Sequence, residues 1–314
     1  MLEISIMIEG QNGLNWSRWQ RIAHVTEELG FAGLFRSDHY TNASPPDLDS
    51  LELWVSLTWL ASHTRRIRFG PLVTPFSFRH PTFTARMATA VDDLSGGRLV
   101  LGLGAGWQAR EHTHYGWDLM DLDGRFARFE EGLEVVTRML HSDVPVDFEG
   151  KYYRLQEAIL LPRPTRAGGP PVLIGGNGAR RTLPLAARYA AEWNASFLSA
   201  ERFSELNALL DDQLLRHGRQ AEQVRRSLMT GCVFGRHGDE VLKKVATRTA
   251  GKYTPVELRQ RGLVIGTPVE IIEQLTRLAE VGVQQVMLQW LDLDDIDGLQ
   301  GLAEQVLPQF SYRE

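Results

Sequence analysis

Short apolar runs recur along the chain and alternate with segments in which apolar residues lie three or four positions apart. Short runs are typical of buried strands, whereas the wider spacing is typical of one face of a helix. The helical spacing is clearest in residues 16–29, 129–140 and 269–278. The strand-like runs are residues 2–8, 32–36, 67–73, 99–103, 172–174, 193–197, 228–234 and 285–288.

Eight strand-like runs separated by helices predict a parallel sheet, because each helix can return the chain to the start of the next strand. Closing such a sheet into a barrel removes both edges, and eight strands leave an interior that side chains fill. We therefore expect an α/β fold in which residues 1–314 form a single (β/α)₈ TIM barrel. Residues 142–171, rich in Pro and Gly, and residues 235–266, a charged and helical stretch, are expected to decorate the barrel.

An open nucleotide-binding sheet is the alternative architecture. It would carry the pattern Gly-x-Gly-x-x-Gly directly after the first strand. Gly102 and Gly104 instead follow the fourth run, and Trp107 stands where the third glycine of the pattern would be. The dinucleotide fingerprint is therefore absent.

Composition narrows the range of partners. The 314 residues include 34 Lys and Arg against 39 Asp and Glu, a formal net charge of -5, which offers no general attraction for nucleic acid. Residues 1–9 alternate apolar and polar positions, unlike a signal peptide, and no apolar run reaches the roughly 18 residues of a membrane helix. The single cysteine, Cys232, has no second cysteine with which to form an internal disulfide. We expect a cytoplasmic protein that acts on a small molecule, with neither nucleic-acid nor membrane partners.

Active sites of (β/α)₈ barrels are built from the loops that follow the strands, so the residues just beyond each run are the candidates. The second run leads into Asp38 and His39. A carboxylate beside an imidazole suits acid–base catalysis near neutral pH, and we predict that both residues are catalytic. The alternative is that the two side chains only cap loops.

Aromatic residues and glycines follow the third and fourth runs. Phe76 and Trp107 are predicted to wall a substrate cavity, because aromatic side chains at a barrel mouth suit a planar ligand. Gly104, Ala105 and Gly106 precede Trp107, and their small side chains let the backbone approach a ligand closely. The alternative for the aromatic residues is that they cover the top of the core.

A second glycine-rich turn follows the fifth run. Gly175, Gly176, Asn177 and Gly178 lead into Ala179 and a helix. Free backbone N–H groups and a positive helix end attract phosphate, so this turn is a candidate phosphate cradle. A tight turn without a ligand is the alternative.

Metal binding is not predicted. Glu111, His112 and His114 lack the i, i+4 histidine spacing that places two ligands on one helix face. The chain also has no cysteine cluster.

Several short motifs occur in a set order along nearly the whole chain. They lie at residues 37–39, 79–81, 94–98, 102–107, 111, 115–116, 148–153, 174–178, 266–268 and 279–283. In this order they resemble the luciferase-like monooxygenase superfamily, whose type is bacterial luciferase, and within it the branch that depends on coenzyme F420.

The resemblance implies a flavin-type coenzyme with its ring over the third and fourth strands and its phosphate on the glycine turn at 176–178. It further implies that Asp38 and His39 contact the ring or assist proton transfer. The peptide bond between Leu72 and Val73 is expected to be cis and to bulge against the ring. A homodimer is also implied.

We therefore hypothesise hydride transfer between coenzyme F420 and an unidentified small organic substrate, with His39 handling the proton. An FMN-dependent monooxygenase is one alternative, and a barrel that binds a flavin without turnover is another. The sequence departs from the sugar-phosphate dehydrogenases of the F420 branch, which carry a catalytic glutamate where Trp107 stands. Glu9 and Glu111 are candidates for this acid, although Glu111 is expected to hydrogen-bond within its own loop.

Overall fold

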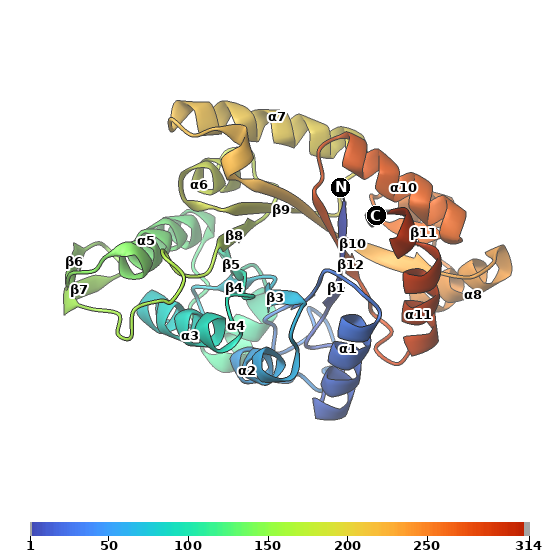
Figure 1. Cartoon of the computed structure of the whole chain (residues 1–314), viewed down its shortest axis with the longest axis horizontal. Coiled ribbons are helices and arrows are strands. Elements are labelled where there is room, and N and C mark those ends of the chain that lie inside the picture. Colours follow the sequence, from blue (N-terminus) through green and yellow to red (C-terminus); the bar gives the residue numbers. More distant parts are fainter. Residues whose placement is uncertain (1, 311–314) are drawn as a thin grey trace.

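The computed structural model describes residues 2–310, and its main feature is a parallel barrel with helices packed around it (Figure 1). The barrel strands are β1 (Glu3–Ile8), β2 (Gly33–Arg36), β3 (Arg68–Pro71), β4 (Thr74–Pro75), β5 (Leu101–Gly104), β8 (Val172–Gly175), β9 (Glu192–Ser196), β10 (Arg225–Phe234) and β12 (Gln285–Gln289).

Hydrogen bonds join these strands in the order β3-β2-β1-β12-β10-β9-β8-β5-β4. A parallel bridge between Phe69 and Leu99 brings β3 against the residues just before β5, so the barrel is nearly closed. β3 and β4 are two parts of one barrel strand, separated by Leu72 and Val73, and the bond between these two residues is cis as expected. The predicted (β/α)₈ barrel is confirmed.

Helices occupy most of the connections between barrel strands. They are α1 (Trp16–Glu28), α2 (Leu53–His63), α3 (Pro81–Leu94), α4 (Ala109–Tyr115), α5 (Leu122–His141), α6 (Thr182–Tyr189), α7 (Ala200–Arg216), α8 (Gly238–Thr249), α9 (Pro255–Gln260), α10 (Pro268–Glu280) and α11 (Ile296–Gln305).

α10 illustrates how local sequence sets a helix and its packing. Thr267 and Glu270 form a reciprocal capping box, and Pro268 occupies the first turn, where its missing N–H costs no helical hydrogen bond. Its buried residues are Ile271, Leu275 and Leu278, whereas Val269 is 66% exposed. The spacing of apolar residues predicts a face of Val269, Ile272, Leu275 and Leu278; Leu275 and Leu278 are buried as predicted, but Ile271 and not Val269 faces the core.

The barrel interior and the layer between barrel and helices form separate apolar clusters. The larger cluster fills the space between the strands and the surrounding helices. The smaller one lies inside the barrel, because alternate residues of a strand point inward. Its buried members are Met7, Phe35, Leu72, Val100, Leu173 and Met287.

The two irregular stretches decorate the barrel as expected, with structure that the pattern did not show. Residues 142–171 carry an antiparallel hairpin of β6 (Val146–Glu149) and β7 (Arg154–Ala158). Residues 235–266 carry α8, α9 and a short strand, β11 (Val264–Gly266), which pairs with the end of β10.

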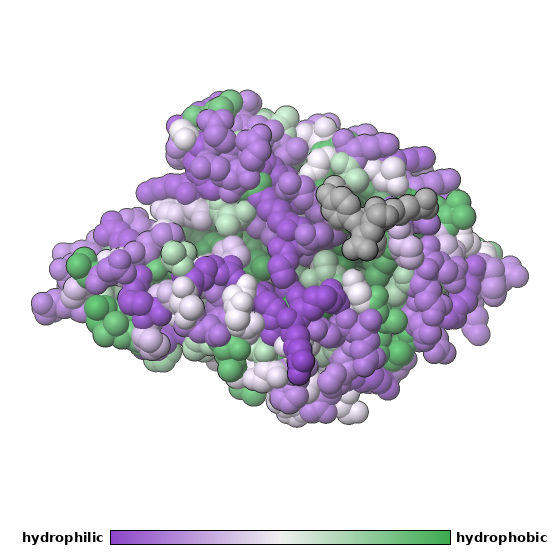
Figure 2. Space-filling view, viewed as in Figure 1, coloured by the Kyte–Doolittle hydropathy of each residue, from purple (hydrophilic) through white to green (hydrophobic). Residues whose placement is uncertain are grey.

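The outer surface is mainly polar. In the view of Figure 2, hydrophilic residues cover most of the molecule, and apolar residues show only in separate patches. Among residues 2–310, no helix combines the length and the hydropathy that crossing a lipid bilayer would require.

Candidate active site at the mouth of the barrel

A cavity of about 600 Å³ lies at the carboxyl ends of the barrel strands, where barrel enzymes place their active sites. Nine of the thirteen residues predicted for the site line this cavity, which supports its assignment as the functional site. They are His39, Leu72, Val73, Gly104, Ala105, Gly106, Trp107, Gly175 and Gly176.

Val73 lies in the cavity wall because two glycines leave room for its side chain. A Cβ at Gly104 would lie 2.5 Å from Val73 Cγ2, and a Cβ at Gly175 would lie 3.0 Å from Cγ1. Gly104 is on β5, which pairs with β4, and Gly175 is on β8, the next strand in the sheet. The glycines therefore accommodate Val73, in addition to any close approach of backbone to a ligand.

His39 and Glu111 form the central polar pair of the cavity. His39 Nδ1 lies 2.7 Å from Glu111 Oε1, and the backbone N–H of Tyr40 donates to Glu111 Oε2 at 3.1 Å. The side chain of His39 is 17% exposed and that of Glu111 is 1% exposed. Glu111 thus bonds to the loop after β2, and the expectation that it bonds within its own loop is wrong.

The pair favours the protonated form of His39. Burial is the largest single influence on the pKa of His39 and lowers it, but the hydrogen bond and charge of Glu111, with the charges of Glu9 and Asp38, outweigh burial. The pKa of His39 therefore lies above its ordinary value. Nε2 of His39 has no hydrogen-bond partner within residues 2–310, so this nitrogen is free to face a ligand.

Trp107 lines the cavity at its opening, and its role as a substrate wall stays a prediction. Its ring is edge-on to the ring of His39, with centroids 5.5 Å apart. Trp107 is 62% exposed, so a large apolar surface stands beside the imidazole and open to solvent.

Asp38 does not line the cavity, although it precedes His39. Its carboxylate accepts from Thr74 Oγ1 at 2.5 Å and forms a buried ion pair with Arg79, also at 2.5 Å. Arg79 in turn reaches Glu52 at 2.8 Å. These contacts anchor the loop that carries Asp38 and His39 to the segment at the start of α3.

Phe76 also lies outside the cavity wall. It is 5% exposed and packs against Phe129 of α5, with ring centroids 5.7 Å apart. Gly132 provides the space, because a Cβ there would lie 2.7 Å from the Phe76 ring.

The second glycine turn differs in detail from the expected cradle. α6 begins at Thr182, after a turn, and the N–H of Gly176 donates to Asn194 O and so belongs to the sheet. Asn177 and Gly178 are not in the cavity wall, and the Asn177 side chain bonds to Ser196. Backbone N–H groups of residues 177–180 have no partner within the described chain.

Arg125 is a cavity residue that the sequence pattern did not identify. It belongs to the first turns of α5, and its Nη1 donates to Gly106 O at 3.1 Å. Its Nε is buried and has no hydrogen-bond partner in the part of the chain that the structure describes. A buried guanidinium donor without an acceptor suits an anionic ligand, because leaving it unpaired is unfavourable.

Glu9, the other candidate acid, accepts amide donors from Gln11 and Gln289, at 3.1 and 2.6 Å, and does not line the cavity. Within residues 2–310, no group of three or more His, Cys, Asp and Glu side chains is placed to hold a metal ion.

Comparisons with known proteins agree with this geometry. The model of the family described as luciferase-like monooxygenase matches residues 3–285. A curated F420-dependent glucose-6-phosphate dehydrogenase of Intrasporangium calvum is 27% identical, over 90% of this chain and 91% of that enzyme. A 4-hydroxyprotoasukamycin monooxygenase of Streptomyces nodosus subsp. asukaensis is 33% identical over 57% of this chain, but the match spans only 47% of that enzyme.

Solved structures share the fold. An F420-dependent secondary alcohol dehydrogenase in complex with an F420-acetone adduct superposes with a TM-score of 0.84 at 17% identity, over 97% of this chain and 98% of that one. The monooxygenase RslO1 from Streptomyces bottropensis superposes with a TM-score of 0.80 at 20% identity, over 98% and 100%. The chain belongs to the luciferase-like monooxygenase family of oxidoreductases.

Proposed function

We propose that this protein is a coenzyme F420-dependent oxidoreductase in which His39 exchanges a proton with the substrate while a hydride moves between substrate and coenzyme. The observation that carries the proposal is the His39–Glu111 pair in the wall of the mouth cavity. Curated relatives that match along about 90% of their length are F420-dependent dehydrogenases, which also supports it.

The residues of the cavity fit a flavin-type coenzyme. Arg125 lines the cavity and, with its unpartnered Nε, would hold the phosphate group; the free N–H groups of residues 177–180 lie outside the cavity wall, next to the lining residue Gly176, and would add to this site. The apolar wall around Leu72 and Val73 would support the ring. When bound, a deazaflavin supplies or accepts a hydride.

The protein residues supply the proton and its position. Glu111 holds Nδ1 of His39, which orients the ring and stabilises the imidazolium form. Nε2 then donates a proton to a substrate oxygen during reduction and accepts it during oxidation. Asp38, through Arg79 and Thr74, keeps the loop that carries His39 in place.

An FMN-dependent monooxygenase is the second candidate, favoured by the local 33% identity to 4-hydroxyprotoasukamycin monooxygenase. Oxygenation would require a site that is sheltered from water. The exposure of Trp107 beside His39 does not favour such shelter. A flavin-binding barrel without turnover is disfavoured. Burying the Glu111 carboxylate is unfavourable, and a protein that only binds a flavin does not need a carboxylate beside His39.

The test is a titration of apoprotein with oxidised F420 and with FMN at equal ionic strength, followed by turnover under nitrogen and under oxygen. Tighter binding of F420 and oxygen-independent oxidation or reduction are the expected results. Tighter binding of FMN with product formed only under oxygen would select the monooxygenase. Binding of either coenzyme without turnover of any substrate tried would favour the non-catalytic barrel.

A further inference from the structure

Permanent positive charge is scarce in the mouth cavity. Among residues 2–310, Arg125 is the only Arg or Lys that lines this cavity. Its unpaired Nε–H is the donor suited to the coenzyme phosphate. His112 also lines the cavity, but Nδ1 contacts Gln108 O at 2.7 Å and Nε2 contacts Ser77 Oγ at 2.8 Å. Once the coenzyme phosphate binds Arg125, no other lining Lys or Arg among residues 2–310 is left to neutralise a substrate phosphate or carboxylate.

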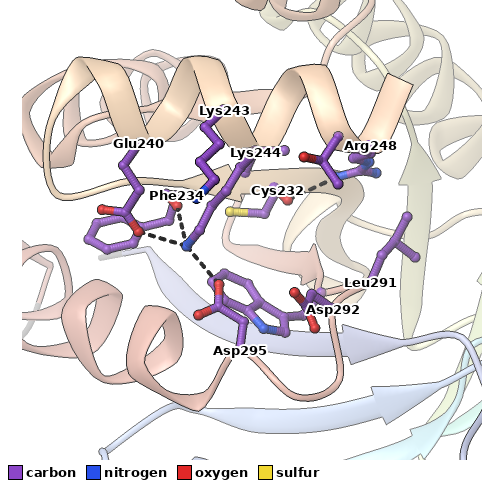
Figure 3. Close-up of a pocket in the computed structure, with 12 residues that line it drawn as sticks. Cys232, Phe234, Glu240, Lys243, Lys244, Arg248, Leu291, Asp292 and Asp295 are labelled. Carbon is purple, nitrogen blue, oxygen red and sulfur yellow. Dashed lines mark hydrogen bonds and ion pairs between the residues drawn. The ribbon is translucent and has the colours of Figure 1, made fainter. Parts of the chain in front are cut away.

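A second cavity of about 610 Å³ lies beside α8, and it does not supply the missing charge (Figure 3). Lys244 lies between Glu240 and Asp295, at 2.9 and 2.7 Å, and donates to Phe234 O at 3.1 Å. Arg248 donates to Cys232 O at 2.9 Å. Both side chains therefore already bond to other groups of the protein.

Among the described residues, Lys243 is the third cation that lines the second cavity, and it is exposed on α8. An exposed ammonium attracts an anion weakly, because water and salt screen the interaction. Asp292 lines the same cavity and opposes an anion further. The two cavities share no lining residue, so the second one does not extend the charge of the first.

The opening of the mouth cavity is apolar. Trp107 is 62% exposed and Leu122, the first residue of α5, is 46% exposed, and both line the cavity. They come from different segments, the loop after β5 and the start of α5. Exposed apolar side chains that converge on one opening are characteristic of ligand-binding surfaces.

From this distribution of charge and apolar surface, we infer that the substrate is an uncharged, largely apolar carbonyl compound or the corresponding alcohol, and that Trp107 and Leu122 bind its apolar body. The inference rests on the proposed function, and it separates this chain from relatives that act on glucose 6-phosphate. In the reducing direction the carbonyl carbon accepts a hydride from the reduced coenzyme. The carbonyl oxygen accepts a proton from His39 Nε2, so the C=O double bond becomes a C–O single bond with new C–H and O–H bonds, and the coenzyme is oxidised.

The test measures ligand binding by calorimetry on protein loaded with whichever coenzyme binds, and on apoprotein if neither does. The probes are 2-acetonaphthone, an uncharged two-ring ketone, and glucose 6-phosphate. We expect binding of 2-acetonaphthone with an affinity that changes little with salt, and no measurable binding of glucose 6-phosphate. Trp107→Ala should weaken binding of the ketone about tenfold or more, which corresponds to about 1.4 kcal/mol.

Trp16→Ala is the matched control, because Trp16 is an exposed tryptophan on α1 outside both cavities. It should leave the affinity for 2-acetonaphthone unchanged. Salt-sensitive binding of glucose 6-phosphate, or ketone affinity that is absent or insensitive to Trp107→Ala, would overturn the inference. Coenzyme affinity is measured first and separately, so a failure of the proposed function would be seen as a preference for FMN or as no coenzyme binding, and not as a change of ligand preference.

Discussion

Glu111 Oε1 lies 2.7 Å from His39 Nδ1, although the two residues are 72 positions apart in the chain. Nearly complete burial of Glu111 makes this contact strong, because a buried carboxylate has few other donors. The contact joins the loop after β2 to α4, so the imidazole is held by two separate segments of the barrel mouth.

Replacing Glu111 with Gln should lower the pKa of His39, because the charge that favours the imidazolium form is lost while burial remains. Reduction needs protonated His39, so its rate should be full below this pKa and decline as the pH rises through it. In Glu111→Gln the decline should therefore begin at lower pH. His39→Ala should reduce kcat by roughly 10²–10⁴-fold at pH values below the pKa of His39, as for loss of a general acid, and by less at higher pH.

The measurement is the pH profile of kcat, with NMR titration of His39 as a second readout that does not depend on turnover. Glu130→Gln is the control, since Glu130 forms an exposed ion pair with Arg188 on the outer side of α5. The raised pKa also implies that the pair stabilises the fold fully below the unfolded pKa of histidine, and that this contribution is lost as the pH rises through the folded pKa. An unchanged His39 titration in Glu111→Gln would contradict the assigned role of Glu111.

A second prediction concerns the wall that Val73 forms. Gly104→Ala places a Cβ 2.5 Å from Val73 Cγ2, so Val73 must move and the wall must change shape. We expect an overpacking cost of roughly 1–3 kcal/mol in the free energy of unfolding. Coenzyme affinity should fall about tenfold or more, which corresponds to about 1.4 kcal/mol.

Gly238→Ala is the control for this substitution, because a Cβ at Gly238 meets no atom within 4 Å. Urea unfolding and coenzyme titration measure the two effects on the same preparations. Unchanged coenzyme affinity in folded Gly104→Ala would separate Val73 from the coenzyme site.

The barrel itself could be predicted from sequence because its strands are buried on both faces and read as apolar runs. Residues 2–8 and 285–288 agree closely with β1 and β12. Thr74–Pro75 escaped prediction as a separate strand because two residues carry no periodicity, and β11 lies in a charged insert that reads as helical. Short strands of this kind depend on the neighbour with which they pair.

Site residues next to strand ends were predictable for a similar reason, since the fold brings those ends together. His39, Gly104 and Trp107 are of this kind. Glu111 was named as a candidate acid, but its contact with His39, like that of Arg125 with Gly106, crosses the mouth to another loop, and no local motif records such a contact. Phe76 shows the converse error, because an aromatic residue just after a strand can turn into the core when a glycine such as Gly132 leaves room.

Arg125 provides a third prediction. Arg125→Met keeps an apolar stem of similar length but removes the guanidinium, so the coenzyme phosphate loses its charged partner. Hydrogen bonds to charged groups contribute roughly 1.5–3 kcal/mol, so the coenzyme Kd should rise about 10- to 150-fold. The salt dependence of Kd should also become weaker. Arg188→Met, at an exposed ion pair, should change neither quantity, and equal affinities for wild type and Arg125→Met would remove Arg125 from the phosphate site.

The last prediction distinguishes a catalytic Asp38 from one that positions the His39 loop. Asp38 is 3% exposed and is paired with Arg79, which keeps a second acceptor in Glu52. Asp38→Asn removes the charge from a buried pair, and such losses typically cost about 3–5 kcal/mol, with the lower end expected here because Glu52 remains. Urea unfolding should show this loss, whereas Glu149→Gln, which breaks an exposed pair with Arg154, should cost no more than about 1 kcal/mol.

Activity then decides between the two roles of Asp38. If the carboxylate only anchors the loop, Asp38→Asn should retain the pH profile of kcat in protein that is still folded, and its losses should follow the unfolded fraction. Asp38→Glu keeps the charge and should recover part of the stability, because a longer carboxylate can still reach Arg79. A kcat reduced by 10²-fold or more in fully folded Asp38→Asn, with stability unchanged, would instead show that Asp38 takes part in proton transfer.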